Sequence, residues 1–390
     1  MRPNKRSPSG VLRDLRGKLG ESLLVAVCNQ AENDAARATT SSTESKRIGD
    51  VFRWQLFLSE AGKEKDLFLK KVRSGERFQH CDYVRGFLVE YRYNRFRTKA
   101  SGEIKVEQLN RALSNIAQAF RNEGLRDPSR DQDGKRHPKI SSLLQTYSNE
   151  DPPVNRQPPL PMSFYKSFAS MKSTNISEAI GQVVGGALHY GMRSCEYSKP
   201  DEKYPRTKIL RLCDIKFYDK HGTEVKTSRR KAYMVKLTFR YQKNGVKNEV
   251  QIRYRSTKKS SMSVVVLWAK IVERIESYNE STPETTINAF EENGKMKFFS
   301  SASVRKHIKA AVTIIGEDIL GVKSSEIGTH TVRTSYATML SHQHVDPKDI
   351  QKAGRWLSDV FLKYIRSNTT LVKLSDAMAK ASNDGLRRLK

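Results

Sequence analysis

The chain has 390 residues and a formal net charge of +29, with 71 Lys and Arg residues against 42 Asp and Glu residues. A positive excess of that size makes a soluble protein repel itself unless a polyanion relieves it, so we expect nucleic acid as the partner. A membrane is the rival partner, but no apolar run approaches the about 18 residues that a membrane-spanning helix needs. The run SLLVAV at 22–27 is too short and lacks the layout of a signal peptide.

The cysteines are few and widely spaced, and no Cys-x-x-Cys pair occurs among Cys28, Cys81, Cys195 and Cys213. The sequence therefore predicts neither a zinc site nor a disulfide framework, which fits an intracellular, reducing compartment. Basic runs such as SRRK at 228–231 are compatible with import into a nucleus if the host is eukaryotic, but such runs also arise by chance in a basic chain. We expect an intracellular, DNA-associated protein that uses no metal ion and no cofactor.

The first half of the chain predicts an arm, a helical domain and a linker. Residues 1–48 are polar and basic and indicate a flexible arm, and residues 49–150 indicate a helical domain. Within this domain an apolar stripe follows a 3-4-3-4 spacing, with Gly124 as a stop: Val106, Leu109, Leu113, Ile116 and Phe120. The proline-rich segment DPPVNRQPPLP at 151–161 resists helix and strand and predicts an interdomain linker.

Aromatic residues alternate with arginines in YVRGFLVEYRYNRFR, residues 83–97. One interpretation is an amphipathic helix whose aromatic residues enter the core while its arginines face water. The other is a helix that faces DNA, because arginines opposite a packed face are where phosphates would lie. Both can hold, so the candidate DNA-binding residues here are Arg85, Arg92, Arg95 and Arg97.

Residues 162–390 predict a second domain that is mainly α-helical with a small antiparallel β-sheet. Two helical segments come first, and the segment 206–219 is strand-like. Val235, Leu237, Phe239 and Tyr241 alternate with polar residues, a turn follows at 243–245, and a partner strand continues the alternation with Val250, Ile252 and Tyr254. From residue 261 onward the pattern is again mostly helical.

Four elements with chemically useful side chains follow one another in this second domain. Arg193 comes after an apolar helix with Glu196 three residues on, and the hairpin turn QKNGVK carries Lys243 and Lys247. His330 and Arg333 then lie three apart at the start of a helix, and AGRWLSDVFLKYIR contains Trp356 and Tyr364.

Each of these residues has a purely structural alternative. Tyr364 lies four residues after Val360, as Ile365 lies four after Phe361, so helical spacing alone would make Tyr364 core filling. A lone tryptophan is more often a packing residue, and a His-x-x-Arg pair arises often by chance. The pair His342 and His344 favours surface polarity over a metal site. The order and context of the four elements argue for function.

This order resembles the tyrosine recombinase/integrase family. The family's first arginine and its acidic partner match Arg193 and Glu196, and its hairpin lysine matches Lys243, with Lys247 as the fallback. Its His-x-x-Arg box, its late His or Trp and its nucleophile match His330 with Arg333, Trp356 and Tyr364 respectively. Tryptophan in place of histidine resembles a Cre-type active site, and the size, basic character and arm suggest a Crypton-type mobile-element recombinase.

The chain departs from the family pattern in two places. The interval from Trp356 to Tyr364 is one residue shorter than in many relatives. The β region is enlarged, which bears on the choice between Lys243 and Lys247.

The resemblance implies a core-binding domain and a catalytic domain that form a C-shaped clamp around duplex DNA. It implies site-specific cleavage and rejoining of strands through a 3′-phosphotyrosine intermediate, without a metal or high-energy cofactor. Four protomers would assemble on two DNA sites, with the tail after Tyr364 forming a helix that docks on a neighbouring protomer. A catalytically inactive DNA-binding regulator of the same fold and a type IB topoisomerase are the alternatives.

Overall fold

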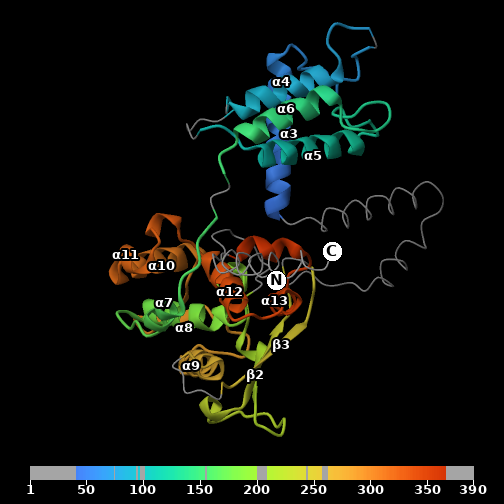
Figure 1. Cartoon of the computed structure of the whole chain (residues 1–390). Coiled ribbons are helices and arrows are strands. Elements are labelled where there is room, and N and C mark those ends of the chain that lie inside the picture. Colours follow the sequence, from blue (N-terminus) through green and yellow to red (C-terminus); the bar gives the residue numbers. More distant parts are fainter. Residues whose placement is uncertain are drawn as a thin grey trace, which may run out of the picture. The chain divides into compact units, whose positions relative to one another are not determined.

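The computed structural model describes residues 41–365 apart from 74, 94, 97–101, 154–155, 200–208, 243–244 and 257–261. These residues belong to two compact units, Met1–Pro153 and Val154–Lys390 (Figure 1). Within these described ranges, no helix combines the length and the apolar composition that crossing a bilayer requires. The fold is mainly α-helical with small antiparallel sheets, which confirms the predicted fold class.

Unit 1 is a helical bundle around one apolar core. Leu109, Leu113, Ile116 and Phe120 are buried in that core, as their spacing predicts, and the chain turns after their helix at Gly124 with φ of +70°. The bundle contains α3 (Ser41–Glu60), α4 (His80–Arg92), α5 (Val106–Asn122) and α6 (Pro138–Glu150). Since α3 begins at Ser41, the helical part extends into the segment that we expected to be an arm.

The second half of the predicted linker packs on the rest of unit 2. Leu160 is buried, and its backbone N–H donates to the Ser335 hydroxyl at 2.8 Å. The Gln157 side-chain oxygen accepts the backbone N–H of Thr331 at 2.9 Å, at the first turn of α12 (Thr331–His342). Part of the segment 151–161, which we expected to be an interdomain linker, is thus packed, because proline excludes helix and strand but does not prevent packing.

Unit 2 builds its core around α8, which is buried along nearly its whole length. Gly181 allows α7 to approach closely, since a Cβ at that position would lie 2.4 Å from the carbonyl oxygen of Phe168. Besides α12, its helices are α7 (Met162–Ala169), α8 (Asn175–Leu188), α9 (Val264–Glu276), α10 (Ser301–Ile315), α11 (Glu317–Leu320) and α13 (Pro347–Ala353). Figure 1 shows α9 beside the β-sheet, with α12 and α13 near one another.

A three-stranded antiparallel sheet of order β1-β2-β3 lies in the first half of unit 2, formed by β1 (Ile215–Tyr218), β2 (Met234–Phe239) and β3 (Glu249–Tyr254). The predicted strand over 206–219 is thus restricted to its last part, because the 3₁₀ turn Leu212–Asp214 precedes β1. A further hairpin, β4 (Ala289–Glu292) with β5 (Lys295–Phe298), lies in the segment that we expected to be mostly helical.

The strands β2 and β3 differ in which face carries their apolar residues. In β2, Val235, Leu237 and Phe239 are buried, as the alternation predicts. In β3, the apolar positions are the exposed ones, at 47% for Val250, 38% for Ile252 and 57% for Tyr254. The polar positions of β3 therefore face inward, where they meet the site described next.

Candidate active site

The Arg-x-x-Glu motif is a single 3₁₀ turn after α8. The chain turns at Gly191, with φ of +51°, where a Cβ would lie 2.5 Å from Cδ1 of Tyr336. Arg193 then caps the turn Ser194–Glu196, and its backbone N–H donates to Glu196 Oε2 at 2.9 Å. Its guanidinium Nη1 lies 3.3 Å from Glu196 Oε1. The buried carboxylate therefore orients both the backbone and the side chain of Arg193.

Arg333 is held by neutral carbonyl groups. It lies in the first turn of α12 and only 2% of its surface is exposed. Its Nη1 donates to the carbonyl oxygen of Gly191, and its Nη2 donates to that of Gly354 at 2.7 Å. No carboxylate among the described residues forms an ion pair with it. The guanidinium therefore has a fixed position and keeps its positive charge.

Burying the charge of Arg333 changes the pKa of its guanidinium group. Burial and, after it, the charge of Arg193 lower the pKa of Arg333 to about 9. At neutral pH the guanidinium still carries a proton. Two arginines thus lie close together, and only Arg193 is bonded to a carboxylate. An anion such as phosphate would relieve this excess positive charge.

Tyr364 meets His330 across the site. The phenol oxygen lies 2.9 Å from Nε2 of His330, which caps the start of α12. The backbone carbonyl of Tyr364 accepts a hydrogen bond from Thr338 Oγ1 at 3.0 Å, which anchors the residue to α12. The phenol oxygen therefore faces a group that can transfer protons, while the ring of Tyr364 packs against the apolar core of unit 2.

The segment before Tyr364 is a 3₁₀ helix, Asp359–Tyr364, where helical spacing had suggested an α-helix. A 3₁₀ helix rises about 2.0 Å per residue, against about 1.5 Å in an α-helix. Six residues in this form span about 3 Å more than in an α-helix. The 3₁₀ form therefore lengthens the short segment between Trp356 and Tyr364.

Trp356 forms one wall of the site. Its ring stacks on Arg333, whose guanidinium carbon lies 4.0 Å from the ring centroid, and its centroid is 5.7 Å from that of Tyr364. The ring folds back over Gly354, where a Cβ would lie 1.5 Å from Cζ3 of the indole. Its buried Nε1 has no hydrogen-bond partner among the residues described. That N–H is therefore a buried donor whose hydrogen bond is not formed within the described part of the chain.

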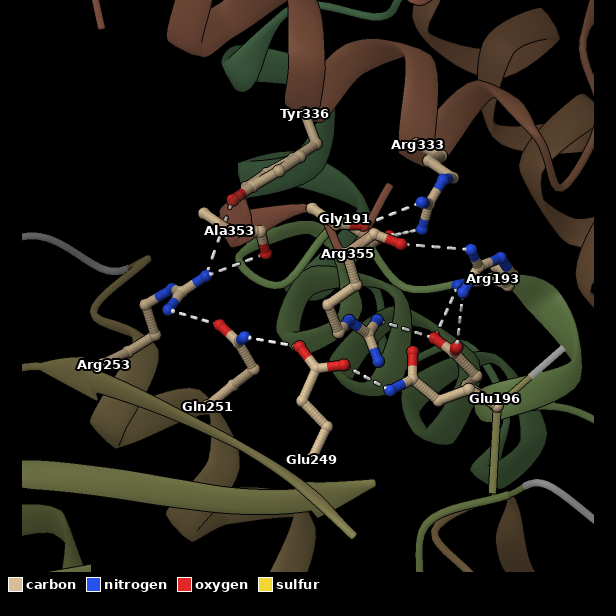
Figure 2. Close-up of polar contacts among 12 residues, drawn as sticks. Gly191, Arg193, Glu196, Glu249, Gln251, Arg253, Arg333, Tyr336, Ala353 and Arg355 are labelled. Carbon is tan, nitrogen blue, oxygen red and sulfur yellow. Dashed lines mark hydrogen bonds and ion pairs between the residues drawn. The ribbon is translucent and has the colours of Figure 1, made fainter. Parts of the chain in front are cut away.

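Two further arginines complete the cluster, and sequence reasoning missed both (Figure 2). Arg355 is fully buried and its Nη2 donates to Glu196 Oε2 at 2.8 Å. Arg253, on β3, donates to the carbonyl oxygen of Ala353 at 3.4 Å and to the Tyr336 hydroxyl at 3.5 Å. The sequence did place an arginine beside Trp356 and polar residues on β3. The role of these arginines depends, however, on contacts with residues far away in the sequence.

The predicted hairpin lysines lie on the connection between β2 and β3. Lys247 is exposed on that connection, while Lys243 lies outside the described residues. The hairpin is found where the sequence predicted it. Which of the two lysines serves the site stays a prediction.

The arginines around α4 fall into two groups. Arg85 and Arg95 are exposed at 41% and 63% of their side chains, near Asp82 and Glu90 respectively. Arg97 lies outside the described residues. The exposed pair is compatible with phosphate contacts.

Arg92 has a structural role, and our prediction that it binds DNA is wrong. Only 1% of its side chain is exposed. It forms ion pairs with Asp151, with Glu103 at 2.8 Å and with Glu150 at 3.7 Å. It also donates to the carbonyl oxygen of Ile104 at 2.8 Å. The guanidinium therefore ties the end of α4 to the start of α5 and the end of α6, out of reach of a phosphate.

Among the described residues, no group of three or more His, Cys, Asp or Glu side chains is arranged to hold a metal ion.

Comparisons with known proteins give structural matches only. No model of a known protein family matches the sequence, and no curated protein matches it. The XerH site-specific recombinase bound to its difH substrate, in a pre-cleavage complex, matches with a TM-score of 0.51 and 14% identity, over 94% of this chain and 86% of XerH.

Two other solved structures are similar at lower scores. The Tn1549 transposon integrase (residues 82–397) with circular intermediate DNA has a TM-score of 0.44 and 13% identity, over 84% of this chain and 98% of the integrase. A lambda integrase (75–356) dimer on a COC′ core site has a TM-score of 0.47 and 13% identity, over 88% of this chain and 94% of that one. From the match to XerH we conclude that this chain has the tyrosine recombinase fold.

Proposed function

We propose that this protein is a site-specific DNA recombinase or integrase that cuts and rejoins strands through a 3′-phosphotyrosine intermediate. The observation that carries the proposal is the 2.9 Å contact between the Tyr364 phenol and His330, set beside the carbonyl-held guanidinium of Arg333. A core tyrosine would need neither a histidine partner nor an uncompensated cation beside it.

The Tyr364 oxygen is the nucleophile of this reaction. It forms a bond to the scissile phosphorus while the bond from phosphorus to the 5′ oxygen breaks, so the phosphodiester energy is kept. His330 takes the phenol proton or donates to the phosphate. A 5′ hydroxyl of a second strand later attacks the phosphotyrosine and releases Tyr364, which reseals DNA without water or a nucleotide cofactor.

The negative charge of the transition state is stabilised by preorganised donors. Arg193 and Arg333 hold the non-bridging oxygens, because their planar guanidinium groups are in place before the reaction. The unpartnered N–H of Trp356 donates to the same phosphate. Glu196 positions the cations and does not touch the substrate.

The leaving 5′ oxygen needs a proton, which we assign to a lysine of the β2–β3 connection. Lys243 is the first candidate and Lys247 the second. An ammonium group on a hairpin tip is a mobile general acid, which suits a group that must follow a departing strand.

DNA is held by both units in this proposal. The net charge of +29 and the exposed arginines around α4, together with Arg97, supply phosphate contacts along a C-shaped clamp around the duplex. Each protomer cuts one strand and four assemble on two sites, with the tail after Tyr364 docking on a neighbour. The protein is DNA-associated, in the nucleus if its host is eukaryotic, and of mobile-element origin.

The test begins by selecting duplexes that the protein binds from a random-sequence pool. A selected site is then nicked near the cleavage point, so that the cut fragment leaves and the covalent complex accumulates. Wild-type protein is expected to form this complex, and Tyr364→Phe is expected to bind equally well without forming it. A covalent complex with Tyr364→Phe would exclude Tyr364 as the nucleophile.

The same assay separates the alternatives. DNA binding by wild-type protein without any covalent complex would indicate an inactive regulator of the same fold. Relaxation of supercoiled plasmid without strand exchange between two duplexes would indicate a type IB topoisomerase.

A further inference from the structure

Glu196 poses a problem of charge balance. Its carboxylate is fully buried and contacts two guanidinium groups, those of Arg193 and Arg355. A buried carboxylate must be neutralised. If Arg193 alone did this, the charge of Arg193 would be cancelled before any phosphate arrived, and the proposed site would lose half of its clamp.

The two contacts are unequal. Arg355 Nη2 lies 2.8 Å from Glu196 Oε2, and the side chains of both residues are fully buried. Arg193 Nη1 lies 3.3 Å from Glu196 Oε1, and 18% of the Arg193 side chain is exposed. The shorter contact in the less polar surroundings is the stronger one. Arg355 is therefore the main counter-ion of Glu196, and Arg193 keeps most of its charge.

Among the described residues, the Arg355 side chain forms no hydrogen bond other than the one to Glu196. Its Nε and Nη1 are buried without hydrogen-bond partners, and its guanidinium carbon lies 3.6 Å from the centroid of the Phe239 ring. Burial lowers the pKa of Arg355, and the charge of Glu196 opposes that shift. A buried guanidinium stacked on a ring with one carboxylate partner is specialised for that carboxylate.

The backbone of Arg355 also acts on Arg193. Three successive carbonyl groups at the end of α13 each accept a hydrogen bond from a different arginine of the cluster: Ala353 from Arg253, Gly354 from Arg333, and Arg355 from Arg193. The last of these joins Arg193 Nη2 to the Arg355 oxygen at 3.3 Å. The residue lies in the left-handed region at φ of +57°, so its geometry is held by its contacts.

We propose that Arg355 is a positioning residue: it neutralises Glu196, so that Arg193 is held in place yet keeps its charge for the scissile phosphate. This inference rests on the proposed function for its last step. It gives a role in the reaction to a side chain that does not touch DNA.

The test is a double-mutant cycle that compares wild-type protein with Arg355→Met, with Glu196→Gln and with the variant that carries both substitutions. Methionine has a similar length and bears the same backbone strain at φ of +57°. In Arg355→Met the Glu196 carboxylate is expected to pair with Arg193 and to neutralise its charge. Covalent complex formation on the nicked duplex is therefore expected to slow about 100-fold. Removing the carboxylate as well is expected to bring the double variant back to within about 10-fold of wild type.

Two controls accompany the cycle. Arg355→Lys keeps the charge and is expected to retain activity within about 10-fold of wild type. Arg253→Met removes another arginine of the cluster that does not contact Glu196, so Glu196→Gln is expected to give it no recovery. A double variant no faster than Arg355→Met would overturn the inference, since a purely structural Arg355 would give additive losses.

Thermal unfolding of the same proteins without DNA tests the ion pair independently of activity. Arg355→Met is expected to lower the midpoint by about 5 °C or more, with recovery in the double variant, because the unpaired buried carboxylate is gone. Additive midpoints would show that Arg355 does not balance Glu196. If wild-type protein forms no covalent complex, the proposed function fails, and so does the proposed effect of Arg355 on phosphate binding by Arg193. The unfolding midpoints of the four proteins would still decide whether Arg355 neutralises Glu196.

Discussion

Arg92 in unit 1 and Arg333 in unit 2 are both almost fully buried, with 1% and 2% of their surface exposed. Their surroundings are opposite. Arg92 is surrounded by the carboxylates of Asp151, Glu103 and Glu150. Arg333 is bonded to backbone carbonyls and lies beside a second arginine.

The acidities of the two groups follow from this difference. Burial alone would lower the pKa of Arg92, but its hydrogen bond to Asp151 and the neighbouring carboxylates raise it. Burial and Arg193 lower the pKa of Arg333. Burial therefore does not distinguish the structural Arg92 from Arg333, which we propose to act on phosphate, whereas the sign of the charges around each arginine does.

The largest effect is expected for Arg333→Met. Removing this preorganised cation should slow covalent complex formation by about 1,000-fold or more. Affinity for the selected duplex should change little, because most binding energy comes from other phosphates. Single-turnover cleavage and equilibrium binding measure the two quantities. An equal loss in both would make Arg333 an ordinary DNA contact.

The matched substitution in unit 1, Arg92→Met, should act on stability. It leaves buried carboxylate oxygens without their cation, so the free energy of unfolding of unit 1 should fall by about 3 kcal/mol. Cleavage by the protein that remains folded should stay near wild type. Denaturant unfolding checks the first statement, and a strong cleavage defect in a stable variant would contradict the second.

The Arg92 cluster should also give unit 1 an acid-sensitive stability. Burial alone would raise the pKa of Asp151, but the Arg92 hydrogen bond, the Val106 N–H and the charge of Arg92 bring it below its usual value. A depressed folded pKa stabilises the folded state above the unfolded pKa of about 3.9 and loses that contribution as the pH falls below it. The free energy of unfolding of unit 1 should therefore depend less on pH in Asp151→Asn than in wild type between about pH 5 and about pH 3, a window on either side of the unfolded pKa of about 3.9.

The smallest effect is expected at the exposed arginines. Arg95→Gln removes a charge whose side chain is 63% exposed. If that charge contacts one phosphate, the affinity should fall a few-fold and the salt dependence of binding should become shallower by about one unit of slope. Titrations at several salt concentrations measure the slope, and an unchanged slope would place Arg95 away from DNA.

Local features were well predicted from the sequence. The apolar spacing of α5 and the turn at Gly124 after it both follow from contacts within a few residues. The order of Arg193, His330–Arg333 and Trp356–Tyr364 predicted a site from short motifs, and the structure brings these side chains together. The strand β3 was located by its alternation, but its inward face was not, because alternation is symmetrical.

By itself, the sequence determined the apolar helix of unit 1, the β2–β3 hairpin and which chemical groups are present. Only the tertiary structure decided which arginines are neutralised. Arg92 meets Asp151 across 59 residues, and Arg355 meets Glu196 across 159. A guanidinium has the same local pattern in either setting, and its counter-charge comes from elsewhere in the chain, so its role is settled by the carboxylate or carbonyl that folding brings to it.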